Sequence, residues 1–374
     1  MVLPLQNPAV WTAPALSHRT TERTAEVTED ESSRTWRYGE FPWLPRELAR
    51  GPRYRVIADN DFAGDPDDLW QLAHHLLSPS VEIRAVVSSR LNAFESIQSA
   101  VATAAQGCAK VRELFSVMGL DADDLLVGGS DDPLTSETDP IESPAARAIV
   151  AEAMRDDDRP LFVTGGGGLT EIASAYLLEP RIANRLTLVW IGGPEYPGHA
   201  EPPAGTLEPE YNLGIDPVAA QVVFNDSSLR VWQVPRNVYR QCVVSDIELH
   251  TRVAGLGNFG AYLWHELQAI RAQLSFLGID RAETYTLGDS PLVLLTALQS
   301  AFDPDPSSSS YEMLSAPTFD EQAGMRLRPD GRPIRVYTRV DTRLMFEDMF
   351  AKFTAFARWR GQSYQPVNRP GPTL

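Results

Sequence analysis

The stretch IADNDFAGDPDD, residues 57–68, places five aspartates within ten positions, directly after the apolar run YRVIA, residues 54–58. A short apolar run rich in β-branched residues predicts a buried strand. The segment DDLWQLAHHLL, which begins at Asp67, carries apolar residues at i, i+3 and i+4 and predicts a helix. The acidic cluster therefore lies where a strand ends and a helix begins. Its members are Asp59, Asp61, Asp65, Asp67 and Asp68.

So many carboxylates in so small a space need a source of compensating positive charge. A helix N-terminus accommodates one or two of them, because it presents free N–H groups and a partial positive charge. Five in a partly buried site would take up protons unless a cation is present. Hard oxygen ligands favour Ca²⁺ or Mg²⁺, and flexible coordination by several carboxylates favours Ca²⁺. A solvated acidic loop with helix-capping roles is the alternative interpretation.

Two other acidic motifs share part of this pattern of aspartates. An EF-hand loop starting at Asp59 would place Trp70 at position 12, where a bidentate Glu is required, which excludes it. A phosphotransferase of the DxDx(T/V) kind would use Asp59 and Asp61. Ala63 stands where its Thr or Val belongs, so this motif is a weaker alternative.

Further strand-length apolar runs alternate with segments of helical length and spacing. They are VEIRAVVSS (81–89), PLFVT (160–164), LTLVWIGG (186–193) and LRVWQVP (229–235). This alternation predicts parallel pairing through right-handed crossovers. We expect one α/β domain, residues 51–360, with an open, mostly parallel sheet flanked by helices and a Rossmann-like core. Residues 1–50 would form a partly irregular extension whose aromatic residues pack onto the domain, and residues 361–374 a tail.

Such a sheet binds its ligands beyond the carboxyl ends of its strands. The aspartates follow one predicted strand, and TGGGG, residues 164–168, follows another. Both segments should therefore lie at the same edge of the sheet.

Charge and cysteine content narrow the class of protein. With 50 acidic residues against 33 Lys and Arg, the formal net charge is -17, which disfavours binding to nucleic acid or to an anionic membrane. The only cysteines, Cys108 and Cys242, are far apart and suggest neither a disulfide framework nor a zinc site. No secretion signal and no run of about 18 uncharged apolar residues is present. We expect a soluble, cytoplasmic protein.

The quoted stretch also resembles the amino-terminal signature of the inosine-uridine nucleoside hydrolase family, D-T-D-x-G-x-D-x-D-D. All five aspartates match, while Asn60 replaces the Thr and Ala63 the first Gly. Gly288 stands where many members have His, and Ser290 is inserted before Pro291. The resemblance runs from about residue 53 to 357. Its later blocks are VTGGGGLTEIASAYLLEPRIANRLTLVWIGG (163–193), EYNLGIDPVAAQVVF (210–224) and LGDSPLVLLTAL (287–298).

The resemblance implies Ca²⁺-dependent hydrolysis of a ribonucleoside to base and ribose, in purine or pyrimidine salvage, by a homo-oligomer, a dimer or tetramer. It implies that Asp61 is the general base and that Asn92 lies near the attacking water. Asp67, Glu210 and Asn212 match positions that bind the ribose hydroxyls. The implied metal ligands are Asp61, Asp68, the main-chain carbonyl of Thr164, Asp289 and, as a ligand or a neighbour of the ligands, Asp65.

The base-binding residues and the acid that protonates the leaving base are not assigned by these motifs. Aromatic residues at helical or strand spacing more often belong to the core than to a pocket. Two alternatives are a related hydrolase acting on another ribosyl or sugar compound, and a non-catalytic ribose- or nucleoside-binding protein. The candidates for the base pocket are Tyr196, Tyr262 and His265, with Trp264, Tyr285 and His199 as further possibilities.

Overall fold

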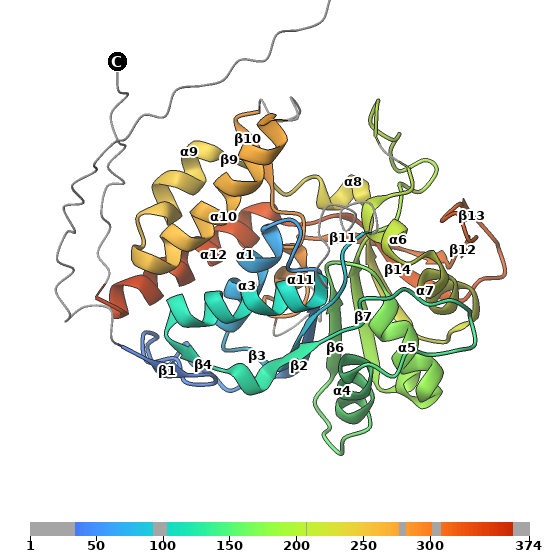
Figure 1. Cartoon of the computed structure of the whole chain (residues 1–374), viewed down its shortest axis with the longest axis horizontal. Coiled ribbons are helices and arrows are strands. Elements are labelled where there is room, and N and C mark those ends of the chain that lie inside the picture. Colours follow the sequence, from blue (N-terminus) through green and yellow to red (C-terminus); the bar gives the residue numbers. More distant parts are fainter. Residues whose placement is uncertain (1–33, 93–102, 207, 277–281, 301–307, 362–374) are drawn as a thin grey trace, which may run out of the picture.

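The computed structural model describes residues 34–92, 103–206, 208–276, 282–300 and 308–361. Its centre is an eight-stranded sheet in the order β11-β14-β8-β7-β6-β2-β3-β5 (Figure 1). Every neighbouring pair is parallel except β11 and β14, which confirms the mostly parallel sheet expected from the sequence. The strands are β2 (Tyr54–Asn60), β3 (Val81–Ser88), β5 (Leu126–Gly128), β6 (Leu161–Gly165), β7 (Leu186–Ile191), β8 (Arg230–Val234), β11 (Ser310–Ser315) and β14 (Pro333–Arg339).

Helices cover both faces of the sheet and form a separate core on each (Figure 1). Successive side chains of a strand point to opposite faces, so Val56 and Ala58 join one core and Ile57 the other. The first core is covered by α1 (Asp67–Leu76), α3 (Thr103–Met118), α10 (Gly257–Phe276), α11 (Pro291–Leu294) and α12 (Thr342–Trp359). The second is covered by α4 (Pro144–Ala153), α5 (Thr170–Leu178) and α7 (Pro217–Gln221).

Shorter elements connect these layers. The helices are α6 (Tyr211–Ile215), α8 (Arg236–Tyr239) and α9 (Asp246–Leu249), with one-turn segments η1 (Asp123–Leu125), η2 (Pro180–Asn184), η3 (Val222–Asp226) and η4 (His250–Ala254). The strands are β1 (Trp36–Arg37), β4 (Leu120–Asp121), β9 (Val243–Ser245), β10 (Thr284–Thr286), β12 (Thr318–Phe319) and β13 (Met325–Arg326). None of the described helices is both long and apolar enough to cross a membrane.

The five strands predicted from the sequence are confirmed as β2, β3, β6, β7 and β8. Three strands of the central sheet, and all the short strands outside it, were not predicted. β14 alternates apolar with Arg and Thr residues, and β11 lies mostly exposed at the sheet edge. β5 has only three residues. The segment SPLVLLTALQSAF, residues 290–302, has apolar residues at helical spacing, but the helix there, α11, spans only Pro291–Leu294, and residues 301–302 lie outside the described residues.

The chain reverses its direction of travel across the sheet at β2. It moves from β2 to β3 and β5 on one side and then continues from β6 to β7 and β8 on the other. At such a switch point the connections diverge and leave a crevice at the carboxyl ends of the strands. Asp59 pairs in register with Gly165, and the Gly166 N–H donates to the Asp59 carbonyl at 3.0 Å. The aspartates and the glycine-rich turn therefore lie together, as the sequence predicted.

Aromatic residues that precede the first long strand pack into the first core. Trp36 is buried, its indole N–H donates to the Met118 carbonyl at 3.0 Å, and β1 pairs with β4. Its ring lies edge-on to Trp43 and Phe356, with centroids 4.9 and 5.9 Å away. This confirms the packing expected for these aromatic residues. The boundaries at residues 50 and 360 stay predictions, and residues 1–33 and 362–374 lie outside the described residues.

Replacing Trp36 by Ala should lower the free energy of unfolding by about 3–5 kcal/mol, because a large buried ring and its hydrogen bond are lost. Equilibrium denaturant unfolding measures this change. The control is Leu48→Ala, since Leu48 in the same segment is 62% exposed and its loss should change stability by less than about 0.5 kcal/mol. Equal, small effects of both substitutions would show that this segment does not stabilise the domain.

Candidate active site

A cavity of about 220 Å³ opens at the carboxyl ends of the central strands. It collects residues from the loops after β2, β6, β7 and β8 and from the segment between β10 and α11. Five of the side chains that line it are carboxylates. The lining residues are Asp61, Asp65, Asp67, Gly166, Ile191, Glu210, Tyr211, Asn212, Tyr239, Arg240, Thr286, Gly288 and Asp289.

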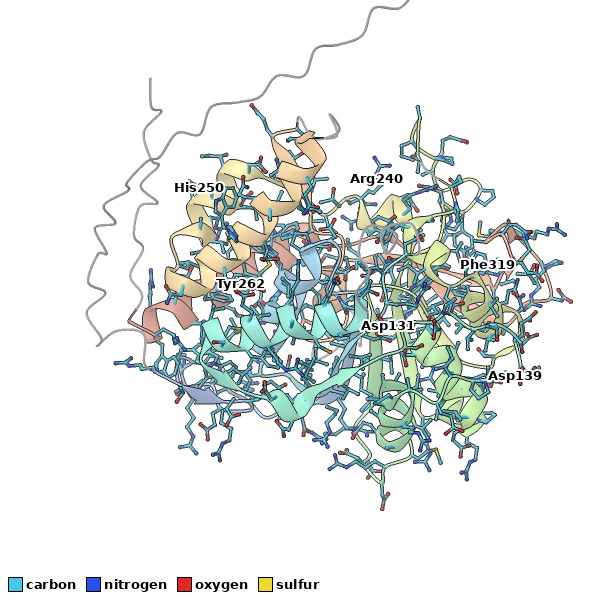
Figure 2. All side chains as sticks on the ribbon, viewed as in Figure 1. Asp131, Asp139, Arg240, His250, Tyr262 and Phe319 are labelled. Atoms are coloured by element: carbon cyan, nitrogen blue, oxygen red, sulfur yellow. The ribbon has the colours of Figure 1, made fainter. Side chains whose placement is uncertain are left out.

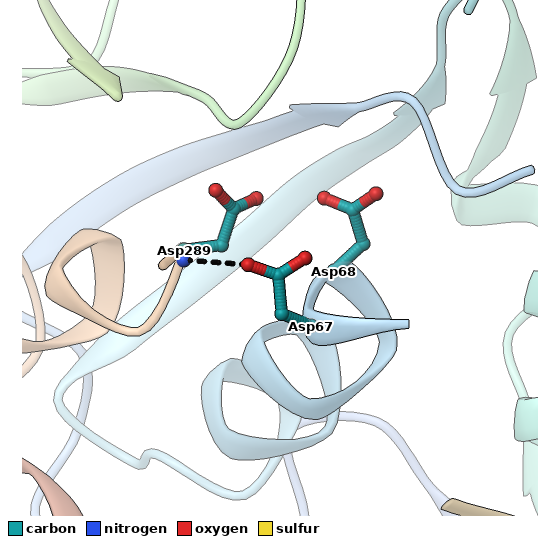
Figure 3. Close-up of side chains that lie close together, drawn as sticks. All are labelled: Asp67, Asp68 and Asp289. Carbon is teal, nitrogen blue, oxygen red and sulfur yellow. Dashed lines mark hydrogen bonds between the residues drawn. The ribbon is translucent and has the colours of Figure 1, made fainter. Parts of the chain in front are cut away.

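Three carboxylates converge beside this cavity (Figure 3). Asp67 and Asp68 begin helix α1, and Asp289 comes from the turn before α11, far along the chain. One ligand atom from each lies within 4.8 Å of the others, and the Asp289 N–H donates to Asp67 Oδ2 at 3.1 Å. The three residues are between 1% and 9% exposed. The sequence hypothesis required Asp289 to meet the amino-terminal cluster, and the structure brings them together.

Asn60 lies between two of these carboxylates. Its amide Nδ2 donates to Asp68 Oδ1 at 2.5 Å and to Asp289 Oδ2 at 2.7 Å, and its side chain is fully buried. Gln71 Oε1 is a third acceptor at 3.3 Å. One neutral amide thus supplies the hydrogen bonds that hold two like-charged groups close to each other.

The electrostatics of the cluster fit a hard divalent cation. Burial, and then the neighbouring carboxylates, raise the pKa of Asp67, Asp68 and Asp289 well above the ordinary value. Asp68 Oδ2 is buried and receives no hydrogen bond from the described residues. A cation would satisfy this oxygen and allow the group to stay ionised. Three carboxylates without His or Cys are the ligand type of Ca²⁺ or Mg²⁺ rather than of softer metals.

The glycine-rich turn after β6 allows the close approach of backbone to this cluster. A Cβ at Gly166 would lie 1.7 Å from Asp289 Oδ2, and one at Gly167 would lie 3.2 Å from the Asp61 carboxyl group. Thr164 lies inside β6, where its hydroxyl donates to the Ile57 carbonyl at 3.3 Å. The part of the turn that touches the carboxylates is therefore Gly166–Gly167, two to three residues beyond Thr164.

The remaining aspartates that were assigned to the metal take different places. Asp61 is 4% exposed and lines the cavity, but it lies outside the closest group of three, in which Asp67 takes part. Asp65 is exposed and accepts a hydrogen bond from the Tyr285 hydroxyl at 2.5 Å. Asp65 therefore lies at the exposed edge of the cavity, whereas Asp61 forms part of its buried wall.

Hydrogen bonds to the backbone hold Glu210 and Asn212 in place at the cavity. The Glu210 carboxylate caps α6 and accepts hydrogen bonds from the Gly193 N–H at 2.7 Å and the Tyr239 hydroxyl at 2.8 Å. Burial raises the pKa of Glu210, while the hydrogen bonds from these donors lower it. The Asn212 amide donates to the Ile191 carbonyl at 2.8 Å. Both side chains are buried and face the same cavity as Asp61 and Asp67.

Several predicted residues do not reach this cavity. Tyr262 lies on α10 and donates its hydroxyl to the Lys110 carbonyl of α3 at 3.1 Å (Figure 2), and His265 is exposed on the same helix. Tyr196 donates to Gln233 Oε1 at 2.7 Å and, with His199, lines a second cavity. The side chains of Tyr262, Tyr196 and His199 thus make contacts outside the cavity, and none of these residues or His265 is among its lining residues.

Asn92 and Trp264 also lie outside the cavity wall. The Asn92 amide contacts the Tyr211 carbonyl of α6 at 3.4 Å, and Trp264 packs edge-on to His250. Asn92 is thus next to a lining residue, and its place near an attacking water stays a prediction.

Sequence reasoning missed Tyr211, Tyr239, Arg240 and Thr286, which line the cavity. Tyr239 and Arg240 follow β8, another strand whose carboxyl end faces the site. The rule that ligands bind beyond the carboxyl ends of parallel strands was the available signal, applied to β2 and β6 but not to β8.

Comparison with known proteins gives a consistent result. The family model described as inosine-uridine preferring nucleoside hydrolase matches residues 56–342. Proteins of that name from Leishmania major and Crithidia fasciculata are 40% identical over 84 residues and 39% identical over 94 residues. These segments cover 22% and 25% of this chain and only 25% and 27% of the relatives, so the chain aligns with about a quarter of their length.

Solved structures share the fold. A plant nucleoside hydrolase superposes with a TM-score of 0.60 at 17% identity, covering 81% of this chain and 100% of that chain. A purine-preferring ribonucleoside hydrolase from Gardnerella vaginalis gives a TM-score of 0.59 at 17% identity, covering 82% and 99%.

Asn60→Ala should lower the free energy of unfolding by about 1–3 kcal/mol in chelator, because two buried carboxylates lose a shared donor. A saturating divalent cation should reduce this loss, since it supplies the missing positive charge. Thermal unfolding with chelator and with calcium chloride measures both effects.

Asn225→Ala is the control for this experiment, because the Asn225 side chain also bridges buried backbone groups, at Phe319, and does not line the cavity. Its cost should be the same with and without the cation. A loss at Asn60 that calcium leaves unchanged would contradict the role assigned to the amide.

Proposed function

The chain belongs to the inosine-uridine preferring nucleoside hydrolase family, and we propose that it hydrolyses the N-glycosidic bond of a ribonucleoside, with Ca²⁺ as its metal. The observation that carries the proposal is the convergence of Asp67, Asp68 and Asp289 beside a cavity that Asp61, Glu210 and Asn212 also line. The products would be the free base and ribose.

Asp68 and Asp289 would hold the cation, together with Asp67 or Asp61. Asp68 and Asp289 are both buried, and Asp68 Oδ2 has no hydrogen-bond partner among the described residues. Flexible coordination by several carboxylates favours Ca²⁺ over Mg²⁺. When bound, the ion supplies charge that offsets the carboxylates and acidifies a nearby water.

Asp61 would act as the general base. It is buried at the wall of the cavity, beside the glycine turn, and it can accept the proton that the attacking water loses. Water oxygen then bonds to the anomeric carbon, and the electron pair of the broken C–N bond leaves with the base. Proton removal and bond formation are thus coupled on one side of the sugar.

The rest of the cavity would bind and stabilise the sugar. Cleavage of an N-ribosyl bond passes through a state with positive charge on the sugar ring, which carboxylates fixed in a cavity stabilise. Glu210 and Asn212 are locked by backbone donors and acceptors before any ligand binds, so they can position ribose hydroxyls with little loss of side-chain entropy. Asp67, at the start of α1, would contribute to the same contact.

The setting of the reaction is part of the proposal. Cys108 and Cys242 are both free and buried, which supports action in a reducing compartment such as the cytoplasm. The family resemblance supports a homo-oligomer, a role in salvage and a small-molecule nucleoside as partner.

Asp61→Asn should reduce kcat at least about 100-fold on the nucleoside that the wild-type protein cleaves best, because a general base contributes about 10²–10⁴-fold. Ribose release from inosine, uridine, adenosine and cytidine is measured with and without chelator. Chelator should abolish release by the wild-type protein.

The matched control is Asp158→Asn, which removes an exposed carboxylate before β6, at the opposite end of that strand, and should retain full activity. Full activity of Asp61→Asn would refute the assigned role. Tight nucleoside binding by the wild-type protein without release of ribose would identify a binding protein instead.

A further inference from the structure

Gly288 stands at the position where many members of the family that this chain resembles carry His, so no side chain enters the cavity there. A Cβ added at Gly288 would lie 3.3 Å from Asp67 Oδ2 and 3.5 Å from Tyr239 Cδ2, so this position faces the cavity between Asp67 and Tyr239. Among the described residues that line the cavity there is no His, Lys or Cys. Among these described residues, assistance to the leaving base would have to come from another kind of group.

Two tyrosines near the cavity are poor proton donors. The Tyr239 hydroxyl donates to Glu210, and burial together with that carboxylate raises the pKa of Tyr239 well above its usual range. The Tyr285 hydroxyl already donates its proton to Asp65, at 2.5 Å. Loss of either proton would place a phenolate beside a carboxylate, which is unfavourable.

Arg240 is the only cationic side chain among the described lining residues. It directly follows Tyr239 at the end of α8 and is exposed (Figure 2). Buried Glu195 does not require Arg240 for neutralisation. Arg236, on the same short helix, already binds both oxygens of Glu195, with Nε at 2.9 Å from Oε1 and a terminal nitrogen at 2.6 Å from Oε2. The Arg240 charge is therefore available at the cavity.

We propose that Arg240 stabilises the departing base, an inference that rests on the proposed hydrolysis. The C–N bond breaks with its electron pair going to the base, and the guanidinium donates N–H hydrogen bonds to the acceptor atoms on which negative charge develops. The guanidinium acts here through its charge and its N–H donors and transfers no proton. The base leaves as an anion and takes a proton from solvent, while the proton of the attacking water goes to Asp61. The step thus needs no titrating acid at position 288.

The test compares two substrates with different needs for leaving-group assistance. Inosine must expel a poor leaving group, whereas 4-nitrophenyl β-D-ribofuranoside releases an anion that is stable in water. Arg240→Gln should lower kcat/KM for inosine about 100-fold, the usual effect of losing one donor to developing negative charge. The effect on the nitrophenyl riboside should be within about threefold. Arg240→Lys, which keeps the charge but loses the planar fork, should fall between Gln and wild type on inosine.

Two further variants make the outcome specific. Arg326→Gln removes one positive charge from an arginine whose side chain is 80% exposed and which does not line the cavity, and it should leave both substrates unaffected. Tyr211→Phe tests the competing donor, because Tyr211 lines the cavity and is 40% exposed. This substitution should change the two substrates equally if Arg240 has the proposed role.

Equal losses for both substrates in Arg240→Gln, or a loss confined to inosine in Tyr211→Phe, would overturn the assignment of Arg240 while the proposed hydrolysis stands. A wild-type protein that cleaves neither substrate, with calcium present, would refute the proposed function and this inference together.

Discussion

The confinement of like-charged carboxylates is the constraint on which the rest of this structure depends. Asp68 and Asp289 are almost completely buried and close to Asp67, so each disfavours ionisation of the others. The chain offsets this repulsion in two ways. Asn60 donates one amide group to both Asp68 and Asp289, and the N-terminus of α1 begins at the aspartates themselves. These dipoles hold the groups in place, and a divalent cation would supply the charge that they lack.

The fold makes this confinement possible through the switch point between β2 and β6. Diverging connections open the crevice, and Gly166 lets the β6 backbone pass where any side chain would collide with Asp289. Residues from β7 and β8 then complete the cavity, with Glu210 fixed by the Gly193 N–H and by Tyr239. A rigid acidic cavity with a single cationic side chain among its described lining residues, Arg240, is the result. In the proposed reaction, that arrangement would separate charge stabilisation of the sugar from charge stabilisation of the leaving base.

Sequence patterns predicted the parts of this arrangement that local chemistry determines. The strand before Asp59, the edge shared with the glycine run and the meeting with Asp289 all follow from run length, topology and motif order. Four consecutive glycines carry no register, so the sequence did not show that Gly166 and Gly167 are the ones that contact the carboxylates, and the Thr164 carbonyl stays a predicted metal ligand. Aromatic spacing does not distinguish a pocket from a helix interface, which is why Tyr262 was proposed for a site that it does not reach.

The central claim is that these carboxylates share one cation, and a crystal structure of the wild-type chain grown with excess Ca²⁺ tests it most directly. The account predicts a single ion per chain with oxygen atoms of both Asp68 and Asp289 at about 2.3–2.6 Å. A structure at saturating calcium with no ion between them, in which the carboxyl groups hydrogen-bond to each other, would contradict the account.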